Sequence, residues 1–214
     1  GDGAHALRLR LCVLPLRPPR STRSTSAFRG ASGARAAACV SAAPGFALTD
    51  TAGRTVNLAD HGGKFVVLEW TNPECPFVQK HYVSKNMQTL QQEAGGKQVV
   101  WLAINSTSED HGEYKSAEQM ANWMRAQGAA PMATLLDGKS ATGKAYAART
   151  TPHMFVIDPT GKIVYNGAID DKRSANPADT KTANNYVRAA LTEAMAGKPV
   201  TVASTTPYGC SVKY

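Results

Sequence analysis

Apolar residues gather in short runs after Pro44, and these runs predict β-strands. "KFVVLEW" (64–70) and "QVVWLAI" (98–104) are rich in β-branched and aromatic residues, which is typical of strands buried in the middle of a sheet. "HMFVIDPTGKIVYNG" (153–167) predicts a hairpin, because the Asp-Pro-Thr-Gly at its centre is a turn sequence. Shorter strands are expected over 46–48, 55–58 and 132–137.

Apolar residues at a helical spacing predict helices between these strands. "SAEQMANWMRAQG" (116–128) opens on a capping box and ends in glycine, and two more helices are expected over 140–149 and 182–196. A further helix is predicted after Cys75, because four apolar residues recur at the spacing of one helical face: Val83, Met87, Leu90 and Ala94. The resulting order, β-β-β-α-β-α-β-α-β-β-α, predicts an α/β domain with a mixed central sheet and helices on both faces.

The composition of the 214 residues fits one soluble folded domain, with 43% hydrophobic and 19% charged residues. No apolar run approaches the ~18 residues of a membrane span, so no membrane partner is expected. Residues 1–43 hold seven arginines and a single acid, and therefore carry +6 of the net charge of +8. The rest of the chain has no basic stripe interleaved with aromatic residues, so nucleic acid is not an expected partner either.

Residues 1–43 are interpreted as a targeting or disordered leader, and residues 44–214 as the domain. The leader is rich in Arg, Ser and Ala and poor in acids. One interpretation, which we favour, is an export signal that ends at the small-residue cleavage site Val40-Ser41-Ala42. An organelle transit peptide and an extension without function are the alternatives.

The cysteines define the candidate chemistry. Cys12 and Cys39 fall in the leader, which leaves Cys75 and Cys210 for the domain. Their spacing fits neither a zinc finger nor a disulfide-rich scaffold, and we expect no metal site and no cofactor. The two cysteines could be a redox pair, a structural disulfide or two unrelated thiols.

Cys75 lies in "WTNPECPFVQ", between a predicted strand and a predicted helix. Pro76 suits the first position of a helix, because its missing N–H is not needed there. Cys75 would then sit at a helix N-terminus, where free backbone N–H groups and the helix dipole favour the thiolate. This pattern indicates a reactive cysteine, and the alternative is an inert buried thiol.

The stretch from Pro44 to Tyr214 resembles the thioredoxin-like superfamily, on its peroxiredoxin-like or redoxin branch, the alkyl hydroperoxide reductase/thiol-specific antioxidant group. Cys75 follows the central strand and starts a helix, as in that superfamily. Thr151-Pro152 precedes the next strand, where the superfamily keeps a cis-proline beside the active cysteine, and the "DPTGK" turn follows. The ending "PYGCSVKY" also resembles that of a peroxiredoxin-like family with a late Gly-Cys-Ser. The resemblance implies a thioredoxin-like fold with thiol redox chemistry.

The departures from these families bear on the reaction. Thioredoxins carry Cys-x-x-Cys, but the positions three residues from Cys75 are Asn72 and Val78. Peroxiredoxins place Thr or Ser three residues before the cysteine and Pro seven before it, where this chain has Asn72 and Leu68. Peroxide reduction is therefore less strongly indicated than thiol redox chemistry in general, and Cys210 is the only other thiol left in the domain.

Three further side chains are candidates for the site. Glu69 lies at the offset where thioredoxins keep a buried acid that relays protons, so it could take the thiol proton; the alternative is a solvent-facing residue. Asn72 could donate a hydrogen bond to the thiolate or an oxyanion, or could serve only the turn. Arg173 could stabilise the thiolate or bind a peroxide, although a solvated loop arginine is the commoner case.

The sequence thus predicts a thiol-dependent oxidoreductase that reduces peroxides or disulfides. Cys75 is the expected nucleophile, Cys210 its resolving thiol in the same or a neighbouring subunit, and a small thiol or a thiol protein the reductant. A metal site of Cys75 with His81 or His153 is weighed and set aside, because the Cys-x-x-x-Cys of thioredoxin-like copper chaperones is missing. The alternative function is a non-catalytic thioredoxin-fold binding module, chaperone-like or copper-handling.

Overall fold

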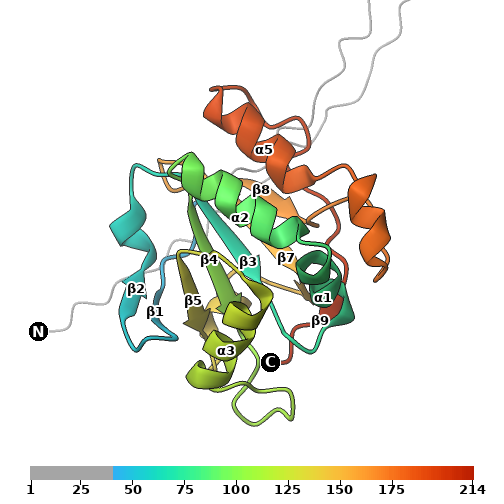
Figure 1. The fold of residues 1–214 in the computed structure, drawn as a ribbon. Coiled ribbons are helices and arrows are strands. Elements are labelled where there is room, and N and C mark those ends of the chain that lie inside the picture. The colour runs from blue at the N-terminus through green and yellow to red at the C-terminus, as the bar shows by residue number, and fades with distance from the viewer. Residues whose placement is uncertain (1–40) are drawn as a thin grey trace, which may run out of the picture. The chain divides into compact units, whose positions relative to one another are not determined.

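A seven-stranded mixed sheet forms the centre of the molecule, with the strand order β2-β1-β5-β4-β3-β7-β8 (Figure 1). The structure is a computed structural model and describes residues 41–214. Strands β3, β4 and β5 run parallel, whereas β7 pairs antiparallel with β3 and β1 antiparallel with β5. The strands are β1 (Ala47–Asp50), β2 (Thr55–Asn57), β3 (Val66–Trp70), β4 (Val100–Asn105), β5 (Ala133–Leu136), β7 (His153–Ile157) and β8 (Ile163–Gly167). The predicted α/β fold class is confirmed.

The helices cover the two faces of this sheet unequally. Helices α1, α2, α3 and α5 pack on one face, and α2 and α5 are seen across it in Figure 1. The opposite face is covered by the end of the short α4 and by the N-terminal strands with the 3-10 helix η1. These elements are α1 (Pro76–Val83), α2 (Asn86–Gly96), α3 (Ala117–Gln127), α4 (Ala141–Ala145), α5 (Tyr186–Met195), η1 (Leu58–His61) and η2 (Pro177–Lys181). None of the helices in this described part of the chain is long and apolar enough to cross a bilayer.

Strand β3 is the most deeply buried element and leads to the candidate site. It pairs with β4 on one side and β7 on the other, and all five of its residues are buried. Successive side chains of a strand point to opposite faces. Val67 accordingly joins the core beneath α1 and α2, while Leu68 and Trp70 join the core on the other face.

The predicted long helix after Cys75 is wrong in one respect, because it consists of two helices. The chain breaks between α1 and α2 at Ser84 and Lys85, and Lys85 adopts the left-handed conformation at φ 63°. The helical period therefore does not continue across the break. Val83, which was expected on the buried face, is 64% exposed, whereas Met87, Leu90 and Ala94 are buried as predicted.

The other helix predictions differ mainly at their ends. The capping box of Ser116 and Gln119 is confirmed, and Gly128 ends α3 in the left-handed conformation. Helix α4 is shorter than the expected 140–149, because the chain turns at Ala147, where φ is 49°. Helix α5 begins only after Asn185, whose side chain accepts a hydrogen bond from the backbone of the first turn.

The N-terminal end of the described chain is attached to the β7–β8 hairpin. Ala42 pairs with Lys162, and the backbone N–H of Ile163 donates to Ser41 O. Contacts with the domain thus begin slightly before the expected start at Pro44. The prediction of a leader, with Cys12 and Cys39, otherwise concerns residues 1–40, which lie outside the described residues.

Candidate active site

Cys75 is the residue that caps the N-terminus of α1. Its backbone is extended, with φ −81° and ψ 119°, and Pro76 occupies the first helical turn. The Cys75 carbonyl accepts hydrogen bonds from the N–H groups of Val78 and Gln79. The predicted placement of Cys75 at a helix N-terminus is therefore confirmed. Its side chain is buried, with 1% of the residue exposed.

The cis-proline prediction is also confirmed. The Thr151–Pro152 peptide bond is cis, and it lies beside Cys75 in the short segment between β6 (Thr150–Thr151) and β7. The Cys75 thiol donates a hydrogen bond of 3.0 Å to Thr151 O. Both residues of the cis peptide are buried.

The C-terminal tail brings Cys210 to the same point. Strand β9 (Cys210–Ser211) pairs antiparallel with β6, with Cys210 opposite Thr151. The Cys75 and Cys210 Sγ atoms lie 2.7 Å apart, and both cysteines are free thiols. The structure therefore brings the two predicted thiols together within one chain, and the tail that carries Cys210 is held by strand pairing.

Gly209 permits this approach. Its φ is +138°, a conformation that side chains rarely adopt, and a Cβ at this position would lie 2.0 Å from Thr151 O. Any other residue would collide with the backbone of β6. The glycine before Cys210 is thus a steric requirement of the β6–β9 pairing.

The environments of the two thiols differ. Burial, followed by the hydrogen bond and the charge of Cys75, raises the pKa of Cys210 to about 12. Cys210 is therefore protonated near neutral pH while it lies against Cys75. Cys75 is left as the candidate nucleophile because it is the N-cap residue of α1, although its thiol contacts Thr151 O and Cys210 Sγ and makes no hydrogen bond to the N–H groups of the first turn.

Glu69 is fully buried in β3, so its interpretation as a solvent-facing residue is wrong. Its carboxylate accepts hydrogen bonds of 2.8 Å from Tyr82 Oη and Trp101 Nε1, and one of 3.3 Å from Gln91 Nε2. Burial raises the pKa of this carboxyl, and the hydrogen bonds oppose the rise. Glu69 lies on the sheet face that α1 covers, but its hydrogen-bond partners are these three side chains and not Cys75.

Asn72 and Arg173 are not arranged around the thiol as the sequence suggested. The Asn72 amide donates to Glu113 Oε2 at 2.7 Å, and its oxygen accepts from the Glu74 backbone, so this side chain serves the turn. Arg173 is exposed in the loop after β8. Among residues 41–214, no lysine or arginine side chain is hydrogen bonded to Cys75.

Neither histidine is held near Cys75 by a metal-like arrangement. His153 Nε2 contacts Asn166 Oδ1 at 2.7 Å, and His81 Nδ1 contacts Asn86 Nδ2 at 2.9 Å. Burial lowers the pKa of His153 to about 4. Within the described part of the chain, no three His, Cys, Asp or Glu side chains are grouped to hold a metal ion.

A pocket adjoins the loop that leads into Cys75. Its volume is about 390 Å³. It lies between this loop and α3, and two of its lining residues, Glu74 and Lys115, form an ion pair of 2.6 Å. Its lining residues include Pro73, Glu74, Gln79, Lys115, Gln119 and Trp123.

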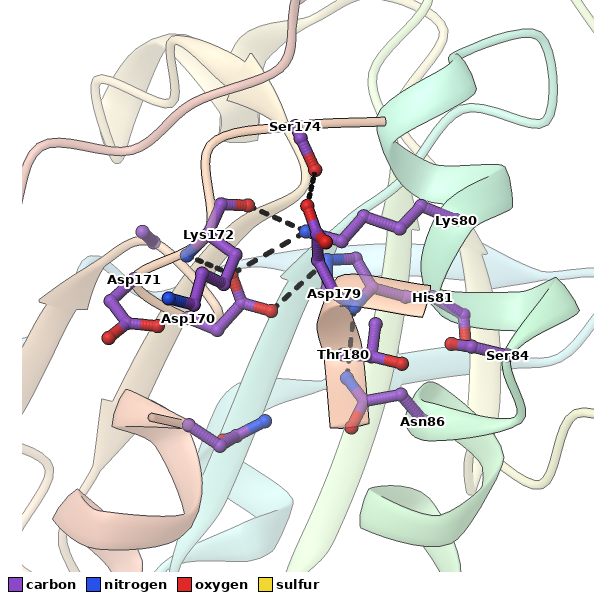
Figure 2. A network of polar contacts seen from close by, with 12 residues as sticks. Lys80, His81, Ser84, Asn86, Asp170, Asp171, Lys172, Ser174, Asp179 and Thr180 are labelled. Carbon is purple, nitrogen blue, oxygen red and sulfur yellow. Dashed lines mark hydrogen bonds and ion pairs between the residues drawn. The ribbon is translucent and has the colours of Figure 1, made fainter. Parts of the chain in front are cut away.

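The sequence did not reveal a buried charged cluster one turn further along α1. Lys80 and His81 point from α1 toward Asp170, which follows β8 (Figure 2). Tyr208 of the C-terminal tail completes the group. We call these four residues the buried cluster. The sequence carried one signal for this cluster. Lys80 and His81 lie between Val78 and Tyr82, two residues that the structure shows to be buried.

The β-α-β order, the cis-proline beside a helix-capping cysteine and the mixed sheet define a thioredoxin-like fold. The chain belongs to the AhpC/TSA family, whose family model matches residues 40–166. This match ends before the tail that carries Cys210.

Solved structures agree with this assignment. An uncharacterized conserved protein from Geobacillus kaustophilus is 32% identical, with a TM-score of 0.72 over 82% of this chain and 91% of that one. A hypothetical protein from Sinorhizobium meliloti is 24% identical, with a TM-score of 0.71 over 84% of this chain and 96% of that one. A putative thiol:disulfide interchange protein DsbE from Chlorobium tepidum shares the fold, at 22% identity and a TM-score of 0.51 over 67% and 90% of the two chains. No curated protein matches this chain.

Proposed function

We propose that this protein is a thiol oxidoreductase whose Cys75 and Cys210 alternate between two thiols and one intramolecular disulfide. The observation that carries the proposal is the 2.7 Å separation of the two Sγ atoms, which belong to residues 135 positions apart. The fold thus brings the thiol of a distant segment against the cysteine that caps α1. The pair thus takes the place of the Cys-x-x-Cys that this chain lacks.

The reaction that this pair supports best is the reduction of a disulfide. The Cys75 thiolate attacks one sulfur of the substrate disulfide, which forms a mixed disulfide and releases the other sulfur as a thiolate. Cys210 then loses its proton and attacks the Cys75 sulfur. This step forms the Cys75–Cys210 disulfide and releases the second substrate thiolate. A thiol reductant of the cell, small or protein, restores the two thiols.

Two features suit a disulfide substrate. The pocket beside Glu74 and Lys115 offers a place for the chain that flanks the substrate disulfide. Disulfide exchange also requires no cation to bind the substrate, which is consistent with the absence of a lysine or arginine bonded to Cys75 in residues 41–214. Arg173 would then remain a solvated loop residue.

A hydroperoxide is the second candidate substrate, and the burial of Cys75 favours it. Only 1% of this residue is exposed, which admits a small molecule more readily than a polypeptide while the tail is in place. The thiolate would attack one peroxide oxygen and break the O–O bond, which makes Cys75 a sulfenic acid, and the leaving alkoxide or hydroxide would take up the proton that the Cys75 thiol had lost. Attack by Cys210 would then form the disulfide and release water.

Glu69 has a proposed role in moving protons. Its buried carboxyl lies on the sheet face that α1 covers, and burial raises its pKa, which favours the protonated form. Because its hydrogen-bond partners are Tyr82, Trp101 and Gln91, a proton from Cys75 would need a mediating group. We therefore place Glu69 as a proton reservoir and not as a direct contact of the thiol.

The deciding experiment is peptide mapping by mass spectrometry after treatment with one equivalent of oxidant. Oxidised glutathione and hydrogen peroxide are used in parallel on the reduced protein. A Cys75–Cys210 peptide within one chain is expected, and the faster oxidant identifies the substrate class. The alternative, a non-catalytic binding module, predicts neither this peptide nor consumption of either oxidant faster than by dithiothreitol alone.

A further inference from the structure

The buried cluster of Lys80, His81, Asp170 and Tyr208 joins the C-terminal tail to the helix that Cys75 caps. Lys80 lies on α1, five positions after Cys75, and its side chain is 0% exposed. Tyr208 lies in the tail, two positions before Cys210. A single residue, Gly209, therefore separates the cluster from the resolving thiol, and its backbone is fixed against Thr151.

Polar contacts hold the Tyr208 hydroxyl on two sides. The hydroxyl donates to Asp170 Oδ1 and accepts from Lys80 Nζ at 3.2 Å. It also lies 3.4 Å from His81 Nε2. The ring packs edge-on against Phe77, with 5.9 Å between centroids. Three residues of α1, Phe77, Lys80 and His81, thus contact one residue of the tail.

The charges of the cluster are balanced within it. Lys80 Nζ lies 3.8 Å from Asp170 Oδ1 and donates to Lys172 O at 2.6 Å, as Figure 2 shows. His81 Nε2 lies 3.9 Å from Asp170 Oδ2. Burial and the neighbouring Lys80 lower the pKa of His81 to about 3, so this ring is neutral. Lys80 and Asp170 are thus the ionisable pair of the group. Burial lowers the pKa of Lys80 and raises that of Asp170, and the attraction between the two opposes both shifts.

Such a cluster fixes the position of the tail more than it stabilises the fold. Burying an ion pair has a large desolvation cost, and apolar residues of the same volume often stabilise a core as well or better. The polar groups restrict Tyr208 to one position, because its hydrogen bonds form only at the correct distances and angles. The place they define for Tyr208 is the one that sets Cys210 against Cys75.

We propose that Lys80, Asp170 and Tyr208 are positioning residues that hold the tail in the conformation in which Cys210 attacks Cys75. This inference rests on the proposed redox pair and assigns the residues that make the pair efficient. It also implies that release of the cluster opens Cys75, because the tail covers it. The cluster then sets the balance between access to Cys75 and closure of the disulfide.

The test is Tyr208→Phe, which keeps the ring on Phe77 and removes only the hydroxyl. Loss of hydrogen bonds to a charged partner is expected to shift the docked tail toward the released state by roughly 10- to 100-fold. Closure of the Cys75–Cys210 disulfide, followed by quenched-flow mass spectrometry, should slow by a similar factor. The first attack by Cys75 should be unchanged or faster. A merely structural role would not divide the two steps in this way.

Tyr146→Phe is the matched control. The Tyr146 hydroxyl is also bonded, to Pro44 O, but on the opposite face of the sheet. This variant should close the disulfide at the wild-type rate. Lys80→Met provides a second test in case Tyr208→Phe folds poorly, since it keeps the length of the side chain and removes the charge that faces Tyr208.

A readout that needs no redox cycle separates this inference from the proposed function. In a Cys210→Ser background, iodoacetamide should alkylate Cys75 faster when Tyr208→Phe is added, and hydrogen exchange at residues 208–212 should accelerate. Unchanged alkylation, exchange and closure rates in Tyr208→Phe would overturn the positioning role. If the wild-type protein forms no Cys75–Cys210 disulfide while alkylation still responds to Tyr208→Phe, the proposed function fails and the tail attachment stands.

Discussion

Two chemically identical side chains, the thiols of Cys75 and Cys210, lie in different surroundings. Cys75 is the N-cap residue of α1, whereas burial and the neighbouring sulfur raise the pKa of Cys210 to about 12. A thiol with a high pKa is a poor nucleophile toward a substrate. Once Cys75 has formed a mixed disulfide or a sulfenic acid, its negative charge is gone, and one cause of the raised pKa of Cys210 goes with it.

This asymmetry predicts different outcomes for the two serine variants. Cys75→Ser should abolish turnover, because no nucleophile remains at the helix N-terminus. Cys210→Ser should complete the first attack and then stop, so a mixed disulfide on Cys75 should accumulate after addition of oxidised glutathione. Intact-mass measurement detects the added glutathione. Accumulation on Cys210 in the Cys75→Ser protein, at the same rate, would contradict the assignment of roles.

Glu69 predicts a pH dependence of stability. Burial raises the pKa of this carboxyl above that of the unfolded chain, so the folded state holds its proton to a higher pH than the unfolded state does. Stability is therefore lost as the pH rises from the unfolded pKa, near 4.3, through the raised folded pKa. Each unit of difference corresponds to about 1.4 kcal/mol of unfolding free energy.

Glu69→Gln removes this dependence, because an amide does not ionise. Urea unfolding between pH 4 and 8 should give a shallower loss of stability in Glu69→Gln than in the wild type. The offset of the two curves also contains the loss of a hydrogen bond, since an amide nitrogen cannot accept from Trp101 Nε1. The diagnostic quantity is therefore the difference in slope. Parallel curves would show that Glu69 is not the carboxyl responsible.

At the scale of elements, patterns of local sequence predicted the elements that depend on local chemistry. The apolar run of β3, the capping box of α3 and the Asp-Pro-Thr-Gly turn were predicted correctly, because each rests on neighbouring residues. The break between α1 and α2 was not predicted, because the helical spacing of apolar residues in the sequence continues on both sides of Ser84 and Lys85. The long helix of the prediction is thus ended by backbone geometry that the spacing of apolar residues does not contain.

The tail strand β9 is an element that the sequence could not predict. It contains two residues, and within residues 41–214 it pairs only with the equally short β6. Its existence depends on Gly209, which passes against Thr151 O, and on Tyr208, which reaches the buried cluster. These contacts join residues far apart in sequence, so no local pattern carries them. The late Gly-Cys was the one visible signal.

Gly209→Ala tests this element. The added Cβ would overlap Thr151 O, and φ +138° is unfavourable for alanine, so β9 should separate from β6. The unfolding free energy should fall by about 1–3 kcal/mol. Alkylation of Cys75 should accelerate, and the Cys75–Cys210 disulfide should no longer form at one equivalent of oxidant.

Gly53→Ala provides the control for this variant. Gly53 also has a positive φ, +81°, but a Cβ there would meet nothing within 4 Å. This change should reduce stability through backbone strain alone and leave the reactivity of both thiols unchanged. If Gly53→Ala affected alkylation of Cys75 as much as Gly209→Ala does, the steric argument for Gly209 would be wrong.

At the scale of the whole molecule, the site is assembled from four segments that the fold brings together. They are the loop after β3, the cis peptide before β7, the segment after β8 and the C-terminal tail. The resemblance to thioredoxin-like proteins placed the first two, because they carry motifs. Asp170 and the attachment of Tyr208 carry no motif, and they were found only from the tertiary contacts.

If Cys75 and Cys210 form the proposed redox pair, their positions in the chain predict a large effect of oxidation on stability. A Cys75–Cys210 disulfide would close a loop of 135 residue positions, which covers most of the domain. In the chain-entropy description, closing a loop of this order restricts the unfolded chain and stabilises the fold by about 5 kcal/mol, less any strain in the folded state. The oxidised protein should therefore unfold at a higher temperature than the reduced protein.

Calorimetry of the oxidised and reduced forms measures this difference, with Cys210→Ser as a control that should show none. The result also bears on the direction of the reaction. By linkage, a disulfide that stabilises the fold is itself stabilised by the fold to the same extent, relative to the unfolded chain. A large increase in Tm would thus favour the reduced protein as an electron donor to its substrate. Equal Tm values would mean that closure of the disulfide strains the folded state by as much as it restricts the unfolded one, and would favour transfer of the disulfide to other thiols.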